Sequence, residues 1–167
     1  MPLKKDMMRD KLFDPKAYNT IFISAADEEK VRKEQQEILV ELICDDKHKG
    51  DKDDVLHLLK REPKAQELLI SAIENTEGDD KRKLLTACWE ADIDVTSHID
   101  LFIDSVINDD FPVALEALTS IENLTGKISP EKAEEMLNLV MTTYPLYVDT
   151  PKGHLLTDLS EVIAKWR

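Results

Sequence analysis

Apolar side chains recur at helical spacing from about residue 25 to the C-terminal end of this 167-residue chain. The last stripe shows the pattern plainly, with Leu155, Leu156, Leu159, Val162 and Ile163 at i, i+1, i+4, i+7 and i+8. That spacing places side chains on one face of an α-helix, whereas a half-buried strand would need strict alternation. The chain has only four Gly and seven Pro, too few for an all-β fold with a turn every ~8–12 residues. The sequence therefore predicts an all-α protein.

The stripes and their end signals predict about eight helices joined by short loops, so that neighbouring helices lie antiparallel and stack as helical hairpins. Residues 25–167 are predicted to form a single domain of this kind. Residues 1–24 lack the periodicity and are predicted to form an irregular N-terminal arm, either frayed along the body or docked as a short segment on a partner. The expected helix starts are Asp27, Asp51, Pro63, Asp79 or Asp80, the stretch Asp94–Ser97, Asp110, Ser129 and the residues after a loop from Pro145 to Gly153.

Some helices are predicted to be buried on more than one side, and some ends carry capping signals. Asp110–Pro112 and Ser129–Pro130 combine a side-chain N-cap with a proline in the first helical turn. The helix that carries Val113–Ile121 is apolar almost all round, which is typical of a helix between two layers. Cys44 and Cys88 lie inside apolar stripes, so the sequence favours two core thiols over a disulfide.

Charge is distributed unevenly along the chain. The formal net charge is −13, and residues 65–167 carry 8 Lys/Arg against 20 Asp/Glu, a balance of −12. Such a surface repels phosphate, because nucleic-acid affinity is built mainly from Lys and Arg. Nucleic acid and anionic membrane are therefore poor partners, and a basic protein segment is a better one. Between Leu84 and Gly126 there is no Lys or Arg but nine acids: Glu90, Asp92, Asp94, Asp100, Asp104, Asp109, Asp110, Glu116 and Glu122.

A weak internal repeat runs through the middle of the chain. Glu67–Ile73 aligns with Asp100–Val106 thirty-three residues further on, and the paired aspartates at 79–80 align with those at 109–110. The segment Asp109–Leu118 is similar to the turn and second helix of a HEAT unit. From Lys64 to Tyr144 the chain resembles the HEAT and armadillo-like helical repeats, although Ala114 and Leu84 stand where such repeats usually carry Arg.

This resemblance implies a short α-solenoid whose curved surface binds another protein, with no catalytic residues. It also implies that the ladder of Asp–Arg pairs found in HEAT arrays is absent here. We expect the chain to be cytoplasmic, because it shows neither a signal peptide nor an apolar run of the ~18–20 residues that a membrane span needs.

The sequence does not match the motifs for catalysis or for metal binding that we considered. The acidic turn from Asp45 has Lys47 and Lys49 where a calcium loop needs oxygen ligands. The four histidines are scattered, without HExxH or paired Glu-x-x-His motifs. No acid falls clearly on an apolar stripe, so a helical hydrolase with a buried carboxylate pair is the least favoured hypothesis. The sequence predicts a non-enzyme with no metal and no cofactor.

The favoured hypothesis is a protein-interaction module, an adaptor or scaffold whose acidic surface binds a basic segment of a partner. The alternative is a structural or regulatory subunit that self-associates, for example as a homodimer, through the apolar end of an incomplete array. The candidate contact residues are Phe111 and eight of the nine acids between Leu84 and Gly126: Glu90, Asp92, Asp94, Asp100, Asp104, Asp109, Asp110, Phe111 and Glu116.

Overall fold

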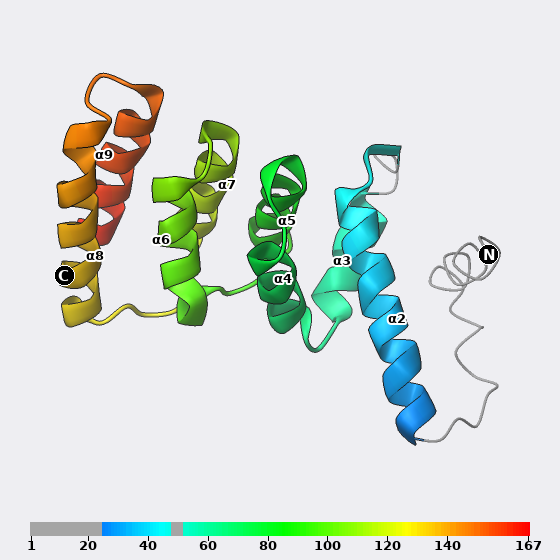
Figure 1. Ribbon diagram of the computed structural model, residues 1–167. Coiled ribbons are helices and arrows are strands. Elements are labelled where there is room, and N and C mark those ends of the chain that lie inside the picture. Colours follow the sequence, from blue (N-terminus) through cyan, green and yellow to red (C-terminus); the bar gives the residue numbers. More distant parts are fainter. Residues whose placement is uncertain (1–24, 48–51) are drawn as a thin grey trace. The chain divides into compact units, whose positions relative to one another are not determined.

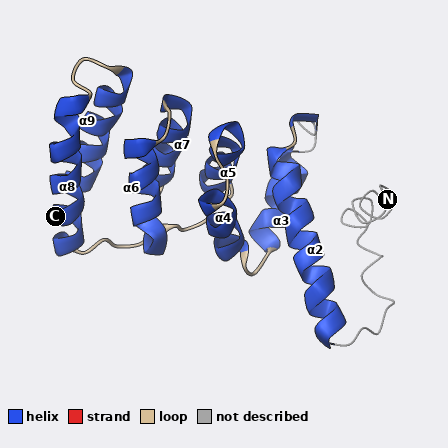
Figure 2. Ribbon diagram, viewed as in Figure 1, coloured by secondary structure: helices blue, strands red, loops and turns tan. Residues whose placement is uncertain are grey.

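The computed structural model of this chain describes residues 25–47 and 52–167. Across those residues it contains eight α-helices and no strand (Figure 1, Figure 2). The predicted all-α class and helix number are confirmed for this part of the chain. The described residues fall into two compact units, one up to Val55 and one from Leu56 on. The single domain over 25–167 stays a prediction, and the predicted arm lies outside the described residues.

The first unit contains helix α2 (Ala25–Cys44) and the beginning of α3 (Lys52–Arg61). Both helices carry acids in the first turn, where the positive end of the helix dipole favours them. The first half of α2 is largely exposed, and its buried side chains Ile38, Leu39 and Leu42 lie in the second half. The apolar face of α2 is therefore buried only in the second half of the helix, where apolar residues follow one another at helical spacing.

The second unit is organised around helix α7 (Phe111–Glu122), which packs against α5 (Gly78–Glu90), α6 (Ile99–Asn108) and α9 (Pro151–Ala164). Helix α4 (Ala65–Glu74) packs on α5, and α8 (Pro130–Thr143) packs on α9. Two short 3-10 helices, η3 (Thr96–His98) and η4 (Tyr144–Leu146), precede α6 and follow α8. These contacts make α7 the central helix of the unit.

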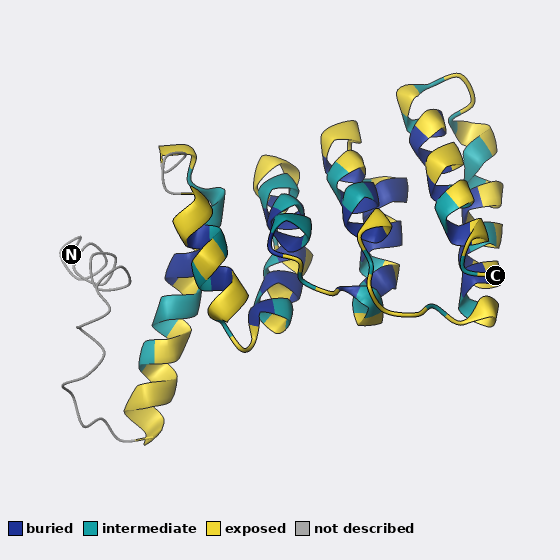
Figure 3. Ribbon diagram, turned by 180° about the vertical axis from the view of Figure 1, so that it is seen from behind, coloured by how far each residue is buried: buried dark blue, intermediate teal, exposed yellow. Residues whose placement is uncertain are grey.

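Small side chains let α7 approach its neighbours closely. Ala114 and Ala117 are fully buried, and Val113, Leu118 and Ile121 complete a surface that is buried on two sides. Figure 3 shows this pattern, with buried residues on the facing sides of neighbouring helices and exposed residues at the outer sides and turns. The predicted burial of this helix on more than one side is confirmed by its contacts with α5, α6 and α9.

Side-chain caps form at three helix starts. The caps predicted for α5 and, from Asp94–Ser97, for α6 do not form, and α6 begins after His98, which makes no side-chain cap. Asp110, Ser129 and Thr150 each accept a hydrogen bond from a backbone N–H of the first turn of the helix that follows. The predicted cap by Asp79 or Asp80 is wrong, because α5 begins one residue earlier, at Gly78, after Glu77, which makes no side-chain cap. Gly78 has a φ of 62°, a left-handed conformation that glycine adopts without strain.

The two loops that join α5 to α6 and α7 to α8 contact each other. The Asp94 carboxylate accepts hydrogen bonds from the backbone N–H and the hydroxyl of Thr96, and the Thr96 hydroxyl oxygen accepts one from the Gly126 N–H at 3.1 Å. From α4, the Gln66 amide reaches the Asp94 carbonyl oxygen at 2.6 Å. Asp94, a predicted partner contact, is thus part of a loop-to-loop connection.

At the start of α9, the backbone of Gly153 lies close to the carbonyl oxygen of Tyr147. The Thr150 hydroxyl oxygen accepts a hydrogen bond from the Gly153 N–H, and its O–H donates to the Tyr147 carbonyl oxygen. A Cβ at Gly153 would lie 2.2 Å from that same carbonyl oxygen. Helix α9 therefore starts at Pro151, two residues before the predicted loop end, because Thr150 caps it.

Replacing Gly153 by Ala is expected to lower the free energy of unfolding by about 1–3 kcal/mol, since the added methyl group collides with backbone. Urea unfolding of the variant and the wild type measures the change. The sign is diagnostic, because an unhindered Gly→Ala change inside a helix raises stability by about 0.5–1 kcal/mol. Ser71→Ala, at an exposed position of α4, is the control and should be near neutral. A more stable Gly153→Ala variant would contradict the close approach.

Candidate functional site

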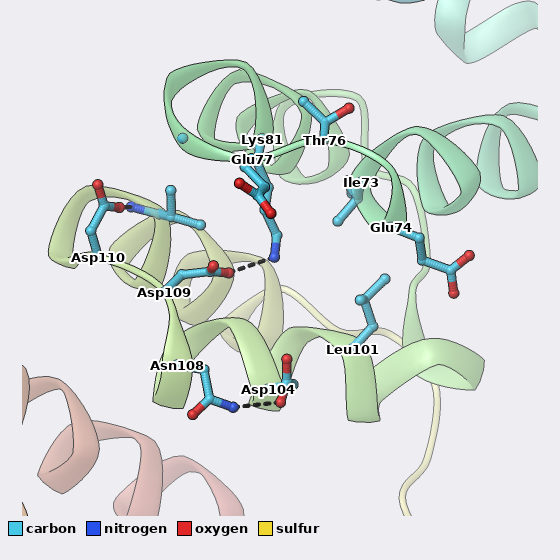
Figure 4. A pocket seen from close by; sticks show the side chains of 12 residues that line it. Ile73, Glu74, Thr76, Glu77, Lys81, Leu101, Asp104, Asn108, Asp109 and Asp110 are labelled. Carbon is cyan, nitrogen blue, oxygen red and sulfur yellow. Dashed lines mark hydrogen bonds and ion pairs between the residues drawn. The ribbon is translucent and has the colours of Figure 1, made fainter.

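An acidic groove lies where the turn between α4 and α5 faces the turn between α6 and α7 (Figure 4). Its volume is about 440 Å³, and twelve residues line it. Five of them are acids, and a single lysine is the only positively charged lining residue. The lining residues are Ile73, Glu74, Thr76, Glu77, Gly78, Lys81, Leu101, Asp104, Asn108, Asp109, Asp110 and Val113.

The groove combines apolar and acidic side chains. Leu101 is half-buried and supplies accessible apolar surface, while Ile73 and Val113 are buried beneath the groove lining. Glu74 and Asp104 are exposed acids on the α4 and α6 sides. A side chain with an aliphatic stem and a cationic head matches such a lining, because the stem covers apolar surface while the head meets carboxylates.

One carboxylate of the groove, that of Asp109, is contacted from two neighbouring helices. The Lys81 ammonium of α5 lies 2.5 Å from Asp109 Oδ2, and the Lys81 side chain is only 11% exposed. The Lys152 ammonium of α9 donates a hydrogen bond to the Asp109 carbonyl oxygen. Asp109 therefore connects α5 and α9 to the turn that leads into α7.

The environment of Lys152 shows that this region is partly withdrawn from water. Burial lowers the pKa of Lys152, and the carboxylates of Asp109 and Asp110 oppose that effect. The Lys152 Nζ also lies 5.4 Å from the centre of the Tyr147 ring, within the range of a cation–π contact. The α8–α9 loop is thereby held against the α6–α7 turn.

The predicted contact residues do not gather at one place. Asp104, Asp109 and Asp110 line the acidic groove. Phe111 lies in the first turn of α7 and is 42% exposed. Glu116 accepts a hydrogen bond at 2.9 Å from the indole N–H of Trp89, which is half-buried on α5.

The remaining predicted acids lie at the ends of α5 and α6. Asp92, with a φ of 55°, follows α5 and forms an ion pair with Lys60 at 3.1 Å. Asp100 pairs with Lys132 at 2.7 Å, and its hydrogen bond raises the pKa of that lysine. Glu90, in the last turn of α5, is half-buried.

Sequence reasoning missed Glu74, Glu77 and Lys81, which complete the groove from α4 and α5. The sequence also shows no Lys or Arg between Leu84 and Gly126. In the folded chain, however, lysines from outside this stretch pair with its acids. Lys60, Lys81 and Lys132 precede or follow that stretch and pair with Asp92, Asp109 and Asp100. In the alignment of the two helix–turn–helix units, Lys81 occupies the position of Phe111, directly after the paired aspartates. Because Phe111 is a predicted contact residue, this alignment was a signal that could have identified Lys81.

Within the described residues the side chains offer little for metal or thiol chemistry. No group of three or more His, Cys, Asp or Glu side chains in 25–47 and 52–167 is arranged to hold a metal ion. Cys44 is half-buried and Cys88 buried, and neither forms a disulfide with another described residue. No described helix is both long and apolar enough to cross a membrane. The groove is the concave feature whose chemistry we develop below.

Comparison with known proteins adds no family to this description. No family model matches the chain, and neither a curated protein nor a solved structure is significantly similar to it. The resemblance to HEAT and armadillo-like repeats stays a prediction.

Replacing Asp109 by Asn is expected to lower the free energy of unfolding by about 1–3 kcal/mol, because a largely buried ammonium loses its charged acceptor. A double-mutant cycle with Lys81→Met isolates the pair, and the double variant should be more stable than the sum of the single losses predicts. Asp104→Asn, at an exposed groove acid, is the control and should cost far less. Strictly additive losses would contradict the pairing.

Burial raises the pKa of the Cys88 thiol to about 12. At pH 8 only about one such thiol in ten thousand is then ionised, and the thiolate is the reactive form. We expect alkylation of the folded chain to modify Cys44 only, and both cysteines to react in denaturant. Mass spectrometry of the labelled peptides measures this. Comparable labelling of Cys88 in the folded chain would contradict its burial in α5.

Proposed function

We propose that this chain is a non-catalytic protein-interaction module that binds a basic segment of a partner protein at the acidic groove. The observation that carries this proposal is the lining of the groove, five acids around apolar surface in about 440 Å³. That volume lies in the range of sites that take small groups, and it suits one or two side chains of an extended segment. No metal or cofactor is part of the proposal.

The charge of the surrounding unit supports the same partner. Residues 56–167 carry 11 Lys/Arg against 21 Asp/Glu, a balance of −10. An excess of this size raises the local concentration of cationic segments and speeds their association. This balance already includes Lys60, Lys81 and Lys132, which pair with acids of the unit, so an excess of negative charge remains.

The architecture we propose is a short solenoid of antiparallel helical hairpins, similar to the HEAT and armadillo-like arrays. The packing of α7 on α5, α6 and α9 and the contacts between successive loops support it. In such arrays each hairpin contacts only its neighbours, and clefts form between adjacent hairpins. The acidic groove, between α4–α5 and α6–α7, would be a cleft of this kind.

A fluorescent Lys-Ser repeat peptide tests the proposal, with a Glu-Ser peptide as the negative probe. The basic peptide is expected to bind, and its affinity should fall with salt as the Debye length shrinks to about 8 Å at 0.15 M. Glu74→Lys and Asp104→Lys should each weaken binding by roughly tenfold, because like charges then meet in the groove.

Glu161→Lys is the matched control for these reversals, since it changes the net charge equally at an exposed position of α9 outside the groove. Asp109 and Asp110 are unsuitable for charge reversal, because the first pairs with Lys81 and the second caps α7. Equal loss of affinity in all three variants would mean that only the overall charge matters, and the groove assignment would fall.

A second candidate function, self-association, has its own observation. Four of the six large apolar side chains that are exposed among the described residues lie between residues 139 and 148, in α8 and the loop after it: Leu139, Met141, Leu146 and Val148. Exposed apolar residues gathered in one segment mark interaction surfaces. Sedimentation of the wild type and of Leu146→Ser decides, because a concentration-dependent dimer that the substitution weakens would favour this alternative.

A further inference from the structure

The acidic groove already holds one ammonium group, that of Lys81. Its Nζ lies 2.5 Å from Asp109 Oδ2, and the residue is 8% exposed. Figure 4 shows the side chain running from α5 into the groove beside Glu77, with its amine directed at Asp109. We propose that Lys81 is an internal ligand of the groove, which competes with the basic side chain of a partner and so sets the affinity and selectivity of this site. The inference rests on the function proposed above.

The rest of the groove leaves room for a second cation. Glu74 reaches the groove from α4, and Asp104 reaches it from α6, where its carboxylate accepts a hydrogen bond from the Asn108 amide (Figure 4). Leu101, which is half-buried, supplies apolar surface along which the stem of an incoming lysine or arginine packs. A helix of about 10–12 Å diameter is too wide for a groove of about 440 Å³. The occupant is therefore a single basic side chain of an extended segment.

Lys81 affects this occupant in two ways. Its positive charge repels a second cation in the same groove, which lowers affinity. Its ion pair also withdraws Asp109 from the carboxylates that a partner could use. A partner segment with one isolated cation is therefore disfavoured. A segment with several cations is also attracted by the negative charge of the surrounding unit, and this attraction offsets the repulsion from Lys81. Selectivity follows from a repulsive element placed inside the site.

Lys81→Met tests the inference, because it keeps an unbranched side chain and removes the charge. Its affinity for the Lys-Ser peptide is expected to be about tenfold higher than that of the wild type. Lys81→Gln should behave alike, and Lys81→Arg, which keeps the charge, should bind as the wild type does. Lys83→Gln is the matched control on α5, since it removes one charge from a residue that pairs with Asp79 outside the groove lining. It should change the affinity by less than about twofold.

The direction of the change separates competition from a structural role. If Lys81 only stabilises the fold, its loss weakens binding or leaves it unchanged. Thermal unfolding monitored by circular dichroism is measured in parallel, and we expect the variant to be less stable yet to bind more tightly. A folded Lys81→Met variant that binds no more tightly than the wild type overturns the inference, although the proposed function survives if Glu74→Lys still weakens binding. Absence of peptide binding in both the wild type and Lys81→Met overturns both.

A measurement on the wild-type chain keeps the inference testable if the Lys81 variants do not fold. A peptide cation bound in the groove repels the Lys81 ammonium and weakens its hold on Asp109. Saturating peptide should therefore raise the rate at which an amine-reactive reagent labels Lys81 by several-fold, read by mass spectrometry. Lys152, which contacts the Asp109 carbonyl oxygen outside the groove lining, is the internal reference and should not gain. Unchanged or slower labelling of Lys81 contradicts the competition.

Discussion

The packing of helix α7 is the constraint on which the second unit depends. Ala114 and Ala117 are fully buried, and their small side chains allow α7 to contact α5, α6 and α9 at once. A larger residue at either position would have to displace neighbouring helices, because protein interiors are close-packed and overpacking is costly. Every element that forms the acidic groove is positioned, directly or through α5 and α6, by this one helix.

Electrostatic contacts add a second level of order at the helix ends. Asp109 receives the Lys81 ammonium at its carboxylate and the Lys152 ammonium at its carbonyl oxygen. Both lysines are at least half-buried, so these contacts are screened less by water and salt than the exposed pair of Lys60 and Asp92. The same turn therefore contributes to the stability of the unit and to the chemistry of the groove, which is why its acids are not simply free for a partner.

Local signals identified the helices well and the site only in part. Ser129–Pro130 and Asp110–Pro112 were sufficient to place two helix starts, because a cap and an early proline act through neighbouring backbone groups. The predicted start of α5 at Asp79 or Asp80 is wrong, since the helix begins at Gly78, which has a φ of 62°. Of the groove residues, the sequence singled out Asp104, Asp109 and Asp110 but not Glu74, Glu77 or Lys81.

The sequence by itself determined the helical class, most helix boundaries and the excess of negative charge. These depend on apolar periodicity, capping and composition, which are properties of short stretches of chain. Only the tertiary structure decided which acids meet cations. The stretch from Leu84 to Gly126 has no Lys or Arg, yet Lys60, Lys81 and Lys132 reach its aspartates from other helices. Ion pairs form over a few ångströms in space, whatever the separation along the chain, so no local pattern encodes them.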